Sequence, residues 1–96
     1  MKSKANPDDF YNRFQQQLED SQNWPGRYMF KFIVKSNSNQ IPKLKQLFDN
    51  PSEGVSLVNS SKNKFQSLTI TLEMKSPLAV IEIYKKASAL KDVIIL

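Results

Sequence analysis

Few residues in this chain could carry out covalent chemistry, and their surroundings do not support it. Residues 61–64 read Ser-Lys-Asn-Lys, which matches the Ser-x-x-Lys pattern of hydrolases that acylate a serine. In those enzymes the serine opens a helix and acts with Ser-Asp-Asn and Lys-Thr-Gly segments, and the chain contains neither segment. Here the four residues fall where a hairpin turn is predicted. We therefore interpret them as turn residues and predict no catalytic residue.

Side chains that could bind a metal or act as a general acid or base are equally scarce. The 96 residues include no histidine and no cysteine, which removes disulfides, thiol chemistry, the usual zinc ligands and the commonest general base. Two carboxylate pairs occur, Asp8-Asp9 and Glu19-Asp20, without a further converging oxygen ligand. The first pair suits the first turn of a helix, where the helix dipole favours negative charge. We expect a protein that is not an enzyme and that has no metal and no cofactor.

Positive charge is the more distinctive feature of the composition. Fourteen Lys and Arg against nine Asp and Glu give a net charge of +5, and the excess lies in residues 27–96. A basic domain attracts small anions, acidic proteins or nucleic acid. Lysines near strand edges also protect against aggregation, so charge alone does not define a site. The candidate contacts, chosen for charge near one predicted sheet edge or turn, are Lys31, Lys35, Lys62 and Lys64.

The elements that must position these lysines begin with a leading helix from about residue 7 to residue 21. Asn6 can cap this helix and Pro7 suits its first turn. Its apolar residues recur every four positions and form one stripe along the helix. Trp24-Pro25-Gly26 then breaks the pattern. The stripe consists of Phe10, Phe14 and Leu18.

Strict alternation of side chains predicts two long strands, at residues 27–35 and 65–74. Phe65 has the wrong parity for the inward set, so either a bulge lies near Gln66 or Phe65 sits on the opposite face. We expect the aromatic residues of the first strand to be core rather than a ligand cage. The inward residues are Tyr28, Phe30, Phe32 and Val34 in the first strand, and Leu68, Ile70, Leu72 and Met74 in the second.

Shorter segments complete the pattern. A helix capped within residues 36–39 is predicted to end at Asn50-Pro51, and a strand follows from residue 55 to about residue 61. Ser76-Pro77 opens a helix to about residue 90, and residues 92–96 form a final strand. The order strand–helix–strand, twice, predicts a ferredoxin-like α+β sandwich with a four-stranded antiparallel sheet. We divide the chain into an N-terminal helical segment, residues 1–23, and this domain, residues 24–96.

Three segments also carry a family resemblance: Trp24-Pro25, the run Tyr-Met-Phe-Lys-Phe-Ile-Val at residues 28–34, and residues 60–71. With the spacing through Tyr84 to residues 93–96, they resemble the YbeD-like family, small bacterial proteins of unknown function. The resemblance implies a ferredoxin-like fold similar to ACT regulatory domains, which bind amino acids at domain or subunit interfaces. It implies no activity, ligand or catalytic residue. Residues 35–39 lack the glycine typical of ligand-binding ACT loops.

The sheet face away from the two domain helices is predicted to be unusually apolar. Met29 and Ile33 from the first strand lie there beside Ser67, Thr69 and Thr71 from the later long strand. We expect the apolar stripe of the leading helix to cover part of the domain, for example this face. The alternative is that the stripe docks on another subunit or a partner.

Taken together, the residues favour a small binding or regulatory module that acts through a protein partner, self-association or a small anionic ligand. The alternative is a domain that binds single-stranded nucleic acid. Such domains stack bases on aromatic side chains of the central strands, and here Phe65 is one candidate platform while the RNP pattern is missing. No apolar run has the length of a signal peptide or a membrane span, so we expect a cytoplasmic protein without a membrane partner.

Overall fold

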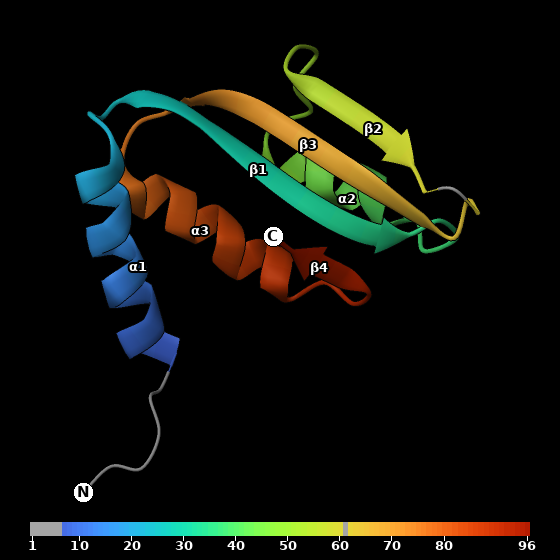
Figure 1. The fold of residues 1–96 in the computed structure, drawn as a ribbon, viewed down its shortest axis with the longest axis horizontal. Helices are drawn as coiled ribbons and strands as arrows, with labels where there is room; N and C mark the ends of the chain where they lie inside the picture. Colours follow the sequence, from blue (N-terminus) through green and yellow to red (C-terminus); the bar gives the residue numbers. More distant parts are fainter. Residues whose placement is uncertain (1–6, 61) are drawn as a thin grey trace, which may run out of the picture.

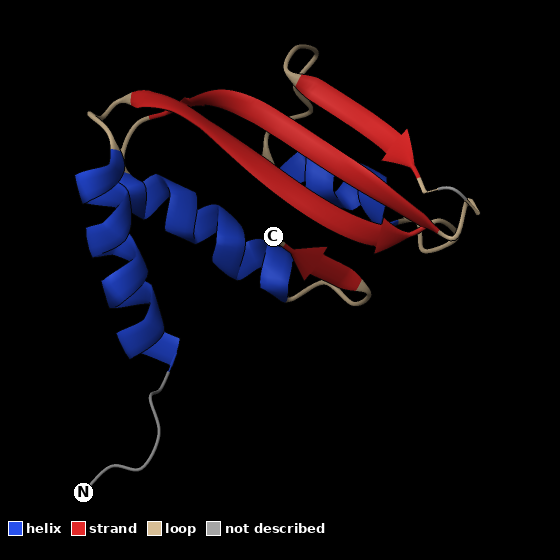
Figure 2. Cartoon of the chain, viewed as in Figure 1, coloured by secondary structure: helices blue, strands red, loops and turns tan. Residues whose placement is uncertain are grey.

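Three helices and four strands make up the part of the chain that the structure, a computed structural model, describes: residues 7–60 and 62–96 (Figure 2). The cap predicted at Asn6 lies outside these residues. The elements follow the predicted order, and their bounds are α1 (Pro7–Ser21), β1 (Gly26–Lys35), α2 (Gln40–Leu47), β2 (Val55–Asn59), β3 (Phe65–Met74), α3 (Pro77–Ser88) and β4 (Val93–Ile95).

The four strands form one antiparallel sheet in the order β2-β3-β1-β4 (Figure 1). Each half of the domain contributes one central and one edge strand, with a helix between its two strands. This is the ferredoxin-like arrangement, so the predicted fold is confirmed. The short β4 pairs with the end of β1, where Ile33 lies opposite Ile94.

The register between the two central strands decides which side chains share a face. β1 and β3 pair without interruption from Gly26 opposite Met74 to Lys35 opposite Phe65. Because residues directly opposite each other project to the same side of a sheet, Phe65 lies on the side of Lys35. No bulge intervenes in this described ladder. Of the two predicted explanations, the one that puts Phe65 on the face opposite the core is therefore confirmed. We call this side, away from the core, the open face.

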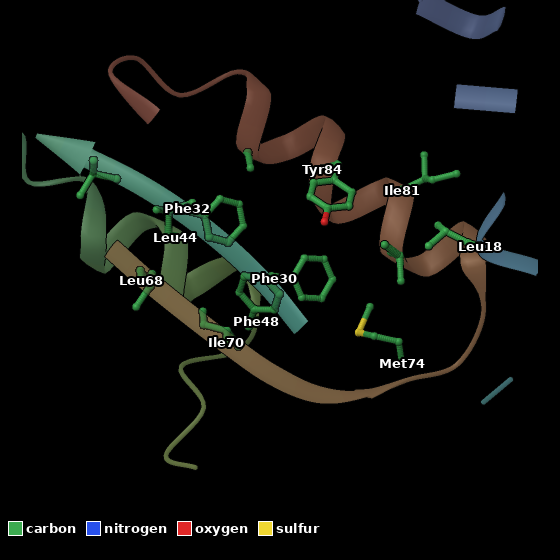
Figure 3. Close-up of a cluster of buried hydrophobic side chains, with 13 residues drawn as sticks. Leu18, Phe30, Phe32, Leu44, Phe48, Leu68, Ile70, Met74, Ile81 and Tyr84 are labelled. Carbon is green, nitrogen blue, oxygen red and sulfur yellow. The ribbon is translucent and has the colours of Figure 1, made fainter. Parts of the chain in front are cut away.

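Aromatic contacts place both domain helices on the other face. The fully buried ring of Phe30 lies 4.8 Å from the ring of Phe48, at the end of α2, and 5.3 Å from that of Tyr84 on α3 (centroid distances; Figure 3). One side of β1 therefore packs against both helices, as its alternation predicts. The buried cluster comprises Leu18, Phe30, Phe32, Val34, Leu44, Phe48, Leu68, Ile70, Met74, Val80, Ile81, Tyr84 and Ala87.

The leading helix α1 packs against α3 rather than on the open face (Figure 1). Leu18 is buried, its carbonyl oxygen accepts a 2.9 Å hydrogen bond from the Trp24 indole N–H, and the Phe14 ring lies 5.4 Å from the Tyr84 ring. The expectation that α1 covers part of the domain is thus confirmed. The suggestion that it covers the open face is wrong, because α1 packs on α3. The apolar stripe is covered unevenly, because Phe10 remains 54% exposed.

The two domain helices begin differently. Ser76 caps α3 as predicted, since its Oγ accepts a 3.2 Å hydrogen bond from the Ala79 N–H and Pro77 occupies the first turn. Asn39, by contrast, precedes α2 in the left-handed region at φ 61° and its side chain makes no capping hydrogen bond. The predicted side-chain cap of α2 is therefore wrong at this position. Asparagine tolerates that conformation better than most residues, which explains its place there.

Replacing Phe32 with alanine should lower the free energy of unfolding by about 3–5 kcal/mol, because it empties a fully buried aromatic site. Met29 is a matched control on the same strand, since it is 57% exposed on the open face. We expect Met29→Ala to cost less than about 1 kcal/mol. Urea or guanidinium unfolding measures both values. Equal costs for the two substitutions would show that the faces of β1 are assigned the wrong way round.

Stability should also fall in alkali because of Tyr84. Its hydroxyl lies 3.0 Å from that of Tyr28, and burial raises the pKa of Tyr84 well above the usual value. Above about pH 10 the unfolded chain therefore loses this proton more readily than the folded chain, which favours unfolding. Unfolding free energies measured from pH 8 to 11 should decline less steeply for Tyr84→Phe than for the wild type. Parallel curves would contradict this assignment.

Candidate functional site

The structure brings together two of the four candidate lysines. Lys35 and Lys64 line one cavity of about 440 Å³ at the end of the sheet. Lys62 is exposed in the β2–β3 turn, which also contains Lys64, but it does not line the cavity. Lys31 lies four residues earlier on β1, on the open face, about 13 Å away along the strand. The remaining lining residues are Ser36, Asn37, Ser38, Asn63, Phe65 and Asp92.

We call this cavity the end pocket. Hydrogen bonds fix the backbone of the two loops that form its walls, the β1–α2 loop and the β2–β3 turn. The Ser60 hydroxyl accepts from the backbone N–H groups of Lys64 and Phe65 at 3.1 and 3.2 Å. The Ser36 N–H donates to the Lys64 carbonyl at 3.0 Å, which ties the β1–α2 loop to the β2–β3 turn. Asn63 completes the turn at φ 55°, in the left-handed region that asparagine tolerates. The backbone of both lysines is therefore fixed, while their side chains stay in solvent.

The charges of the end pocket are only partly matched. Lys35 Nζ lies 3.9 Å from Asp92 Oδ1, and both side chains are at least half exposed, so water screens this pair. Lys64 has no such partner among the described residues. The Ser36 hydroxyl is buried and finds no hydrogen-bond partner there either. The pocket therefore presents two ammonium groups and one carboxylate, and the Ser36 hydroxyl is buried without a partner among the described residues.

Apolar side chains from three of the four strands lie along one line across the open face, and the β3 position on this line is Ser67. Val58 lies beside Ser67, Ser67 beside Ile33, and Ile33 beside Ile94. Val58 and Ile94 are 59% and 55% exposed. The ring of Phe65, 40% exposed, borders the row and helps to line a shallow hollow of about 140 Å³. We call Val58, Ile33 and Ile94 the apolar row.

Only part of this row could be predicted. Alternation along β1 placed Ile33 on the open face, but Val58 and Ile94 were missed. Their strands are short, and β4 has only three residues, so its alternation cannot show which residue faces outward until the pairing with β1 is known. The signal available in the sequence was the unbroken run of apolar residues 93–96. A strand with one buried face needs apolar residues only at alternate positions, so this run places apolar side chains on both faces.

A third cavity lies between the leading helix and the domain. It measures about 380 Å³ and opens between Phe10 and Phe14 of α1 and the tyrosine pair described above. Its walls are chiefly aromatic and aliphatic, and Lys85 Nζ lies nearby, 5.1 Å from the centre of the Tyr11 ring. The polar side-chain groups in this lining are tyrosine hydroxyls.

No three or more acidic side chains among residues 7–60 and 62–96 come together as a metal site would require. No helix in the same residues has both the length and the apolar character needed to cross a bilayer.

A family model described as a protein of unknown function, DUF493, matches residues 19–96. The chain belongs to this family. The DUF493 region begins in the last turn of α1 and includes the entire sheet with both helices that cover it. Comparisons with curated proteins and with solved structures gave no match. The DUF493 description assigns no activity, so the function has to be argued from the surfaces of the domain.

Proposed function

We propose that this chain is a non-enzymatic binding module that docks an acidic protein partner on the open face of its sheet. The observation that carries the proposal is the apolar row, which lies uncovered between lysines. The docked partner would contact Ile33 and Ile94 at the centre and Lys31 and Lys35 beside them. Lys62 and Lys64 would add positive charge from the adjoining turn.

The composition of the open face supports a docking role. A sheet face that only meets water usually presents polar residues at alternate positions. Here Val58, Ile94 and Met29 are each more than half exposed, and Ile33 lies directly opposite Ile94. An exposed apolar patch with a polar rim is typical of a protein-binding surface.

Charge favours an acidic partner over a second copy on this face. Lys31 and Lys35 project from it, and the one carboxylate projecting from it among the described strand residues belongs to Glu73, opposite Arg27 at the far end. Two copies joined face to face would bring lysines against lysines. An acidic partner would instead gain from the same charges, mainly through faster association.

Nucleic acid fits the face less well. Proteins that bind single strands stack bases on several aromatic rings. Phe65 is the one aromatic side chain projecting from the described part of the open face, and its neighbours Ser67 and Ile33 offer no ring. We therefore retain single-stranded RNA only as a competing outcome of the test.

The test begins with capture from a lysate of cells that express the chain naturally, using wild-type and Ile33→Asp protein as paired baits. A protein retained only by the wild type is then purified and titrated by isothermal calorimetry. We expect an acidic protein whose affinity falls about tenfold or more with Ile33→Asp, because a carboxylate at the centre of the row is desolvated on binding.

Two lysine variants serve as a matched pair. Lys31→Ala should weaken binding several-fold at low salt and less at high salt. Lys86→Ala removes an exposed lysine from α3 and should leave the affinity unchanged. Binding that tolerates Ile33→Asp would refute the proposal, as would a salt-dependent complex with single-stranded RNA in place of a protein.

A second candidate function, binding of a small anion, is favoured by the end pocket. Lys35 and Lys64 both line it, and the buried Ser36 hydroxyl lacks a partner among the described residues. Phosphate oxygens accept hydrogen bonds from ammonium and hydroxyl groups. The Asp92 carboxylate opposes such a ligand, so binding should be weak in the unmodified chain.

Asp92→Asn provides the test, because asparagine also tolerates the φ of 60° found at this position. The substitution should change the unfolding free energy by less than about 1 kcal/mol, since the ion pair is exposed. We expect it to strengthen binding of inorganic pyrophosphate, measured by NMR shifts of the residue 36–38 amides, and Lys64→Ala to weaken it. Affinities that do not respond to either substitution would exclude the pocket.

A further inference from the structure

The outer edge of β2 lacks the usual protection against pairing with another strand. β2 is an edge strand, and no described element lies beyond it (Figure 1). Exposed edges normally carry lysine, proline or a bulge that discourages association. The five residues of β2 are Val-Ser-Leu-Val-Asn, without charge or proline, and Leu57 and Val58 are 45% and 59% exposed.

Hydrogen bonds at the two ends of β2 determine which backbone groups face outward. The Gly54 carbonyl accepts from the Thr71 N–H, and the Ser60 N–H donates to the Phe65 carbonyl, both at 2.8 Å. Even-numbered residues of β2 therefore direct their N–H and C=O groups toward β3. Backbone groups alternate in an antiparallel strand, so the groups of Val55, Leu57 and Asn59 point to the open edge.

We propose that β2 pairs antiparallel with β2 of a second copy of this chain, about a two-fold axis at Leu57. In that register Leu57 lies opposite its own counterpart, and Val55 lies opposite Asn59 of the other copy. Every outward N–H of the strand then meets an outward C=O. The two four-stranded sheets become one continuous sheet, joined by an interface that is the same on both sides.

Side chains agree with this register. Leu57 projects toward the helix-covered side, opposite Leu68, yet it is 45% exposed because it lies at the edge. Across the two-fold axis it would pack against Leu57 of the second copy, which removes apolar surface from water on both chains. On the open face Val58 would lie beside Ser56 of the second copy, so no charged side chain enters the interface.

Charges just beyond the strand favour a second copy over an unrelated strand. Glu53 precedes β2 and Lys62 follows it, and both are exposed. Antiparallel pairing about Leu57 brings the end of β2 that follows Glu53 against the end that precedes Lys62 of the other copy. The same edge is thus complementary to itself in hydrogen bonding, in apolar contact and in charge.

Mixing two variants tests the two-fold register. Sedimentation velocity should show the wild type associating reversibly to a dimer as concentration rises. Leu57→Lys alone and Leu57→Glu alone should each weaken association about tenfold or more, because like charges would face each other. An equimolar mixture of the two variants should restore the dimer. Leu78→Lys is the control, since Leu78 is 52% exposed on α3 and takes no part in the β2 edge.

Amide hydrogen exchange of the wild type gives an independent readout that needs no substitution. The amides of Val55, Leu57 and Asn59 should gain protection as concentration rises, while those of Ser56 and Val58 stay protected throughout. A chain that remains monomeric at millimolar concentration would overturn the proposal, as would a dimer that Leu57→Lys leaves intact. Failure of the mixture to associate would exclude the Leu57 axis. None of these outcomes depends on the partner proposed for the open face.

Discussion

The contact of one ring with two helices determines the plan of this domain. Phe30 projects from the central strand β1 and touches Phe48 after α2 and Tyr84 on α3. Because one side of the sheet holds both helices, the other side receives no cover from within the domain. α1 does not change this, since it adds to the helical layer by packing on α3. The open face with its apolar row is a consequence of that one-sided packing.

The sequence predicted the parts of the fold that rest on side-chain periodicity. Alternation along β1 and β3 identified the core residues and the open face, and Ser76-Pro77 marked the start of α3. It could not predict contacts between segments distant in the chain. The position of α1 depends on the fit of Leu18 and Phe14 against the domain, and an amphipathic stripe shows only that some surface is covered, without showing which one.

The candidate site was predictable to a similar extent. Charge near a predicted sheet edge or turn selected four lysines. The loop hydrogen bond from Ser36 to Lys64 brings Lys35 and Lys64 to one pocket, while the register of β1 places Lys31 farther along the open face. The apolar row was harder to see, because its members come from different strands. Val58 and Ile94 come into line with Ile33 only through the sheet order, which no local pattern in the sequence contains.

The alternation within β2 has a consequence for how the proposed contacts combine. Ser56 and Val58 present side chains to the open face, whereas Val55, Leu57 and Asn59 direct their backbone groups sideways. A ligand at Ile33 and Ile94 and a strand at the β2 edge would therefore contact different parts of the sheet, although Val58 and Lys62 lie close to both. Two copies joined at the edge would hold two faces at a fixed spacing on the same side of one sheet. A target with two matching segments would then be bound with avidity, and modest contacts at each face would suffice.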